Sequence, residues 1–105
     1  MKLFVSDMKD YNLDERLDIL VEGGMSLAEA KLQLEKVDLL VDEMKRGVAT
    51  FSFRKKDGTI REARGTLVVD ASEYTFKGGQ ASPKVVPFWD CDKLAWRSFA
   101  LATLC

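Results

Sequence analysis

Two short runs of alternating apolar and polar residues lie on either side of Asp57-Gly58, within the segment 48–66. Successive side chains of a β-strand point to opposite faces, so each run predicts a strand with one apolar face. An Asp-Gly pair between two such runs is typical of a tight β-hairpin. Either a two-residue loop or a type I turn with a left-handed glycine in a bulge fits. The choice decides whether Arg61 or Glu62 lies beside Phe53.

The segment before Gly47 has a helical period instead. Asn12 and Ser26 are each followed three residues later by a glutamate, which is the spacing of a capping box at a helix start. Two helices are therefore predicted, over residues 13–22 and 27–46. The second carries apolar residues at steps of three and four: Leu27, Ala30, Leu34, Val37, Val41 and Met44.

Short apolar runs continue after the hairpin turn. The strand that follows the turn is predicted from Thr59 to Val69, with a sharp bend at Gly65. Further strands are predicted over residues 73–77, 85–90 and 94–101.

Helices followed by five short strands indicate an α+β fold. An N-terminal helical hairpin over residues 1–47 is predicted to precede a small five-stranded antiparallel barrel of SH3 or Sm type over residues 48–105, in one compact domain. The predicted barrel core consists of Val48, Phe51, Phe53, Ile60, Leu67, Val69, Tyr74, Phe76, Val86, Phe88, Trp96 and Phe99.

The composition argues against most enzyme classes. The chain contains no histidine, which is the usual general base at neutral pH and the commonest zinc ligand. Two cysteines are too few for a disulfide framework or a four-cysteine zinc site, and the acidic groups at 14–22 and 90–92 fit solvated faces better than metal ligands. We therefore expect a non-enzymatic protein without metal or cofactor. No apolar run approaches the about 20 residues of a membrane span, and the N-terminus meets acidic residues too early for a secretory signal, so a cytoplasmic location is expected.

Several separated motifs resemble the WYL_2 family: Phe51–Arg61 with its Lys-Lys-Asp-Gly, Gly65-Thr66, Phe88–Asp90 and Trp96–Phe99. The resemblance covers roughly residues 48–104, and the long helix lies outside it. It implies an Sm-like SH3 barrel from gut Bacteroidales or their phages, and hence a bacterial cell or a phage-infected host. It implies no particular activity, because a fold alone does not fix a function.

The charges are unevenly distributed. Residues 1–46 carry 11 acidic and 7 basic side chains, a net −4, whereas residues 47–105 carry 6 acidic and 9 basic ones, a net +3. A basic hairpin beside aromatic residues can contact phosphates or stack bases, or its cations can merely protect an exposed strand edge. Arg97 beside exposed aromatic residues suits an anionic ligand, or it can instead pair with a carboxylate such as Asp90 and help lock the last strand. The candidate ligand residues are Arg54, Lys55, Lys56, Arg61, Arg64, Trp96, Arg97 and Phe99.

The second helix is longer than a small barrel can cover, because its 20 residues span about 30 Å. Part of its surface is therefore predicted to face a second subunit or another protein, with Leu32, Leu34, Leu39 and Val41 as candidates. Two functions follow from the sequence. The first is a regulatory or phage-related accessory module that binds single-stranded nucleic acid or a small anionic, nucleotide-like ligand. The alternative is a structural or protein-interaction subunit that forms homo-oligomers through its helices.

Overall fold

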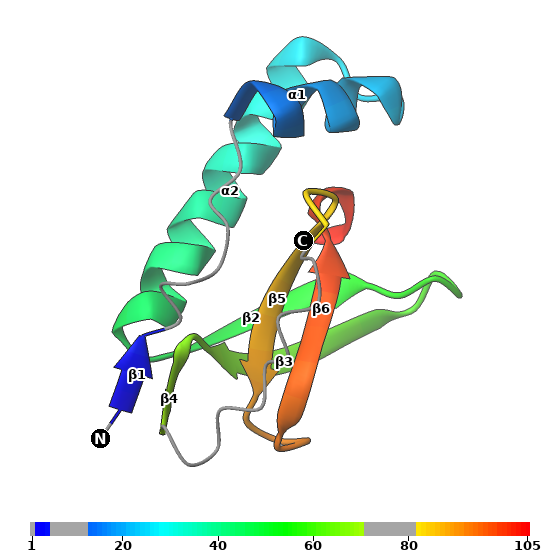
Figure 1. The fold of residues 1–105 in the computed structure, drawn as a ribbon. Coiled ribbons are helices and arrows are strands. Elements are labelled where there is room, and N and C mark those ends of the chain that lie inside the picture. Colours follow the sequence, from blue (N-terminus) through cyan, green and yellow to red (C-terminus); the bar gives the residue numbers. More distant parts are fainter. Residues whose placement is uncertain (1, 5–12, 71–81) are drawn as a thin grey trace.

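In the computed structural model of the 105-residue chain, residues 2–4, 13–70 and 82–105 are described. Two helices precede most of the strands (Figure 1). The helices are α1 (Leu13–Glu22) and α2 (Leu27–Arg46), with the predicted bounds, and a short 3-10 helix, η1 (Leu101–Thr103), lies near the C-terminus. The strands are β1 (Lys2–Phe4), β2 (Val48–Arg54), β3 (Ile60–Thr66), β4 (Val68–Asp70), β5 (Val85–Asp90) and β6 (Ala95–Ala100). No helix in these ranges is long and apolar enough to cross a membrane.

Helix α2 begins and ends as its sequence predicts. The Ser26 hydroxyl accepts a hydrogen bond from the backbone N–H of Glu29 at 3.1 Å, and the N–H of Gly47 closes the last turn on the carbonyl of Glu43 at 3.1 Å. One face of the helix lies in the core. Its buried side chains are Ala30, Gln33, Leu34, Val37, Leu40 and Met44.

The described residues show a four-stranded sheet, and the predicted fifth barrel strand is not among them. The main sheet has four antiparallel strands in the order β2-β3-β5-β6, and β1 pairs separately with β4. The predicted strand at 73–77 lies outside the described residues. Strands β3 and β5 pair only at Gly65 with Asp90 and at Thr66 with Trp89. The two hairpins, β2–β3 and β5–β6, therefore meet at one corner and cross there (Figure 1).

The hairpin turn adopts the second of the two predicted forms. The N–H of Gly58 donates to the carbonyl of Lys55 at 2.9 Å, and the N–H of Lys55 donates to the carbonyl of Thr59 at 2.8 Å. Gly58 has a φ of +89°, as a left-handed bulge glycine requires. This turn places Arg61, and not Glu62, opposite Phe53.

The predicted strand from Thr59 to Val69 is interrupted just beyond Gly65. A Cβ at Gly65 would lie 2.7 Å from the ring of Phe88 and 3.0 Å from that of Phe51, so only glycine permits this close approach. After the break, the N–H of Leu67 donates to the carbonyl of Met44 at 2.9 Å, which joins the end of β3 to α2.

The core lies between α2 and the concave side of the sheet. Phe51, Phe53, Phe88 and Phe99 form its centre, with ring centroids 5.1–6.3 Å apart. Leu67 and Val86 are also buried as predicted, and Trp96 is half-buried. The predictions for Val48 and Ile60 are wrong: they are 61% and 55% exposed because they alternate onto the outer face of their strands. The side chains of Val69, Tyr74 and Phe76 lie outside the described residues.

The C-terminal residues close the structure without forming a regular strand. Leu104 makes an isolated antiparallel bridge to Phe53, and the N–H of Cys105 donates to the carbonyl of Ser52 at 2.9 Å. The buried amide of Gln33 donates to the carbonyls of Leu101 and Leu104 at 2.8 and 2.9 Å. Helix α2 therefore holds the segment that continues the sheet back to β2.

Candidate functional site

The end of the β2–β3 hairpin carries three neighbouring exposed cations, Arg54, Lys55 and Lys56. Figure 1 shows this end projecting beyond the other elements. The side chain of Asp57 fixes the turn by accepting from the N–H of Thr59 at 3.0 Å and from its hydroxyl at 2.6 Å. These bonds lower the pKa of Asp57, so the turn carries one anion beside its cations. None of the three cations forms a salt bridge with a residue that the structure describes.

Arg61, unlike the cations at the turn, forms a salt bridge within the described part of the fold. Its guanidinium forms a salt bridge with Asp90, whose side chain is fully buried, and lies 5.8 Å from the ring centroid of Phe53. The second carboxylate oxygen of Asp90 accepts from the N–H groups of Asp92 and Lys93 at 3.0 and 3.1 Å. The predicted alternative that Arg97 pairs with Asp90 is therefore wrong, because Arg61 and backbone groups occupy this carboxylate.

The environment of Asp90 favours its ionised form. Burial alone would raise the pKa of the carboxyl. The hydrogen bond from Arg61 and those from the backbone outweigh burial, and the pKa of Asp90 is lowered from its usual 3.8. The salt bridge therefore joins β3 to the far end of β5 as a fully ionised pair at neutral pH.

Arg64 makes a weaker contact with the same turn. Its Nε lies 3.4 Å from a carboxylate oxygen of Asp92, and the two side chains are 57% and 54% exposed. Such exposed pairs contribute little to stability. The five predicted cations of the hairpin thus separate into three at the projecting end and two that contact the β5–β6 turn.

The predicted residues of β6 do not form one surface. Trp96 is half-buried and packs edge-on against Trp89, with ring centroids 5.9 Å apart, on the outer face of the sheet. Phe99 is 3% exposed within the core, which removes it from the residues that can contact a ligand in this structure. Arg97 shares the face of Phe99 but is exposed. Arg97 is the member of this group most accessible to an anion.

The acidic side chains and thiols of the described residues form no cluster that could bind a metal ion, because no three of the Cys, Asp and Glu side chains converge as potential ligands. Burial raises the pKa of the half-buried Cys91 above its usual 9.0, and Asp92 and Asp90 add to this while Arg64 opposes it. A thiol shifted in this direction is a poor nucleophile at neutral pH.

The candidate interface residues of α2 fall into two groups. Leu32 and Leu39 are 64% and 67% exposed, whereas Leu34 is buried in the core and Val41 is half-buried against it. Leu34 is therefore not part of any accessible surface. The heptad pattern identified the core face of α2, and the exposed leucines lie on the face opposite to it.

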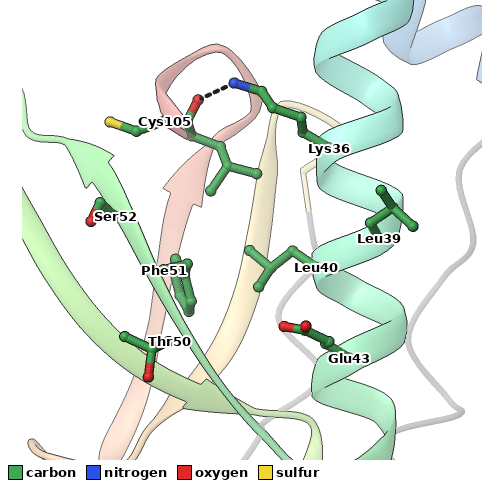
Figure 2. A pocket seen from close by; sticks show the side chains of 9 residues that line it. Lys36, Leu39, Leu40, Glu43, Thr50, Phe51, Ser52 and Cys105 are labelled. Atoms are coloured by element: carbon green, nitrogen blue, oxygen red, sulfur yellow. Dashed lines mark hydrogen bonds between the residues drawn. The ribbon is translucent and has the colours of Figure 1, made fainter.

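A groove that the sequence did not predict lies between α2 and β2 (Figure 2). It has a volume of about 290 Å³. Its lining combines apolar and charged side chains: Lys36, Leu39, Leu40, Glu43, Thr50, Phe51, Ser52, Leu104 and Cys105. Lys36 donates to the carbonyl of Leu104 at 3.4 Å across the upper end of the groove. The seven-residue spacing of Lys36 and Glu43 was visible in the sequence, but their position beside a strand edge was not.

Comparison with known proteins identifies the family. The chain is 30% identical over 73 residues to a protein of Enterobacteria phage T4 described as an uncharacterized 11.5 kDa protein in the Gp31-cd intergenic region. The alignment covers 64% of this chain and 72% of the phage protein. No solved structure matches. Residues 37–105 match the WYL_2 family, described as having an Sm-like SH3 β-barrel fold, and the match includes the second half of α2, which the sequence had placed outside the resemblance. The chain therefore belongs to the WYL_2 family.

Proposed function

We propose that the protein is a non-enzymatic binding module that contacts the phosphates of single-stranded nucleic acid through the end of its β2–β3 hairpin. The observation that carries this proposal is the projecting turn with Arg54, Lys55 and Lys56, which are exposed and form no salt bridge within the described ranges. Cations placed on a protruding ribbon reach a nucleic-acid backbone without burying other surface.

The structure of the hairpin supports phosphate contact more than base recognition. Phe53, the aromatic residue of the hairpin that lies closest to the turn in sequence, is 8% exposed and packs in the core, so it offers no platform for stacking. Ile60 is exposed opposite Arg54 and can contact a sugar or a base edge. We therefore expect weak binding that depends on salt and hardly on base sequence.

The experiment compares two variants with the same loss of charge. Lys55→Ala/Lys56→Ala removes two cations at the turn, and the matched control Lys31→Ala/Lys84→Ala removes two exposed cations elsewhere. Binding to a labelled single-stranded oligonucleotide is measured by fluorescence anisotropy over a range of salt concentrations. For single strands each phosphate contact contributes about 0.7 to the slope of log K against log salt. The turn variant should lower this slope by about 1.4 relative to the wild type.

Two results would contradict the proposal. One is the absence of oligonucleotide binding by the wild-type protein even at low salt. The other is an equal loss of slope in both variants, which would indicate that net charge alone governs the attraction and that the turn is not a site.

A second candidate function is protein association through α2. It is favoured by a specific observation: Leu32 and Leu39 are both more than 60% exposed on one face of this helix, and Leu39 lines the groove along β2. Large apolar side chains at regular helical spacing on an exposed face are typical of interaction surfaces.

A further inference from the structure

The exposed face of α2 has a regular pattern of its own. Its residues follow one another at steps of four and three: Leu32, Lys36, Leu39, Glu43 and Arg46. All are exposed, and this spacing keeps them on one narrow stripe along the helix. A stripe with this period is the kind that packs against another helix.

The charges of this stripe are complementary to those of a second copy of the stripe that runs antiparallel to it. Lys36 and Glu43 lie at equal distances on either side of the Leu39-Leu40 pair. When two copies of the helix pack antiparallel about this point, each Lys36 meets the partner's Glu43, and Leu39 meets the partner's Leu39. Leu32 then lies beside the aliphatic stem of the partner's Arg46, which can cover it. A twofold interface requires a surface that is complementary to itself, and this stripe meets that requirement.

The edge of β2 next to this stripe has unpaired backbone groups. The carbonyl of Ser52 accepts from Cys105 and so points away from β3. Backbone groups alternate in direction along a strand, so those of Thr50 and Val48 point the same way. These groups have no hydrogen-bond partner among the residues whose structure is described. An unpaired edge of this kind is a template for another strand.

The groove connects the two features. Leu40 and Phe51 lie at its base, Leu39 and Glu43 border it on α2, and Thr50 borders it on β2 (Figure 2). We infer that this surface binds a second copy of the chain, so that α2 packs antiparallel on the partner's α2 and the β2 edges approach each other. The inference rests on the second candidate function. The reversed charge pattern favours a second copy over a foreign peptide, because a peptide would not have to match it.

The test uses the full chain and measures its mass in solution over a range of concentrations by sedimentation equilibrium. The wild type should approach twice the chain mass as concentration rises. Lys36→Glu should raise the dissociation constant about tenfold, because two symmetric ion pairs become repulsive. Glu43→Lys should do the same. The double variant Lys36→Glu/Glu43→Lys should recover the wild-type constant, since its charges are complementary again.

Controls separate this interface from general charge effects and from the proposed hairpin function. Lys31→Glu and Asp42→Lys change exposed charges on the other flank of α2 and should leave the mass unchanged. Leu39→Asp should give a folded monomer, verified by circular dichroism, that retains oligonucleotide binding at the hairpin. A monomeric wild type at every concentration, or a double variant that does not recover, overturns the dimer. Loss of oligonucleotide binding by Lys55→Ala/Lys56→Ala would leave the dimer inference untouched.

Discussion

The buried carboxylate of Asp90 holds the corner where the two hairpins cross, and replacing it should destabilise the fold. It accepts hydrogen bonds from the Arg61 guanidinium and from the N–H groups of Asp92 and Lys93. Asp90→Asn keeps the shape and one acceptor oxygen but loses the charge. The new amide N–H₂ faces the guanidinium, so two donors meet where a donor and an acceptor were paired.

The expected cost follows from the burial of the two partners. A hydrogen bond to a charged group contributes about 1.5–3 kcal/mol. Breaking a fully buried pair costs about 3–5 kcal/mol because the remaining charge is left without solvent. Arg61 is 26% exposed, so its charge recovers part of its hydration when Asp90 is neutral. We therefore expect Asp90→Asn to lower the free energy of unfolding by about 2–3 kcal/mol.

Urea unfolding followed by the fluorescence of Trp89 and Trp96 measures this change, because the two rings pack together on the β5–β6 hairpin. With a slope of about 1–3 kcal/mol per molar urea, the midpoint should fall by about 0.7–3 M. Asp92→Asn is the matched control: its partner Arg64 is more than half exposed, so the cost should stay within about 0.5 kcal/mol. Equal urea midpoints for the two variants would refute the claim that the Asp90 carboxylate stabilises the corner where the hairpins cross.

The destabilisation caused by Asp90→Asn should depend on pH. The pKa of Asp90 is lower in the folded protein than its ordinary 3.8. At a given acidic pH, this group therefore binds fewer protons in the folded state than in the unfolded state. Its contribution to stability is complete above the ordinary value and is lost as the pH falls through the folded pKa. The difference in unfolding free energy between the wild type and Asp90→Asn should be constant near neutrality and shrink below about pH 4. A difference that shrinks between pH 7 and 5 would contradict this.

Two further substitutions test how the sheet bends and closes. Gly65→Ala should cost about 1–3 kcal/mol by urea unfolding, because its Cβ would lie 2.7 Å from the ring of Phe88. Gly47→Ala, where a Cβ meets nothing within 4 Å, is the control, and a similar cost for both would disprove the packing argument. Gln33→Met should leave the Leu101 carbonyl without its side-chain donor and leave the Leu104 carbonyl with only the longer bond from Lys36, and so accelerate hydrogen exchange at the N–H of Cys105. Unchanged exchange at that N–H would show that α2 does not hold the segment.

Local features of the chain were predictable because they depend on neighbours in sequence. The capping residue Ser26 and the terminal Gly47 set the ends of α2, since each satisfies backbone groups within a few residues. The Asp57-Gly58 pair predicted the hairpin, and the alternation of β2 predicted which aromatic side chains face the core. The motifs that resemble WYL_2 lie in the β2–β3 hairpin and in β5 and β6, and the family match over residues 37–105 confirms the resemblance.

The candidate site was predictable only in part. The cations of the hairpin were named from the sequence, but it could not show that Arg61 is paired with Asp90 while Lys55 and Lys56 project from the turn. That distinction depends on where the two hairpins cross, because Arg61 and Asp90 lie 29 positions apart in the sequence. Phe99 was named both as a core residue and as a candidate ligand residue, and its burial in the core decides between the two, because α2 covers the face of β6 that carries it.

The sequence by itself determined the helices, the hairpin and its turn residues, because backbone hydrogen bonds and side-chain periodicity act over a few residues. Three features were decided by the tertiary structure alone: the close approach of the Phe88 ring to Gly65, the return of Leu104 to Phe53, and the groove between α2 and β2. These features depend on contacts between distant segments whose side chains must fill one core together. Their geometry follows from packing, which no local pattern encodes.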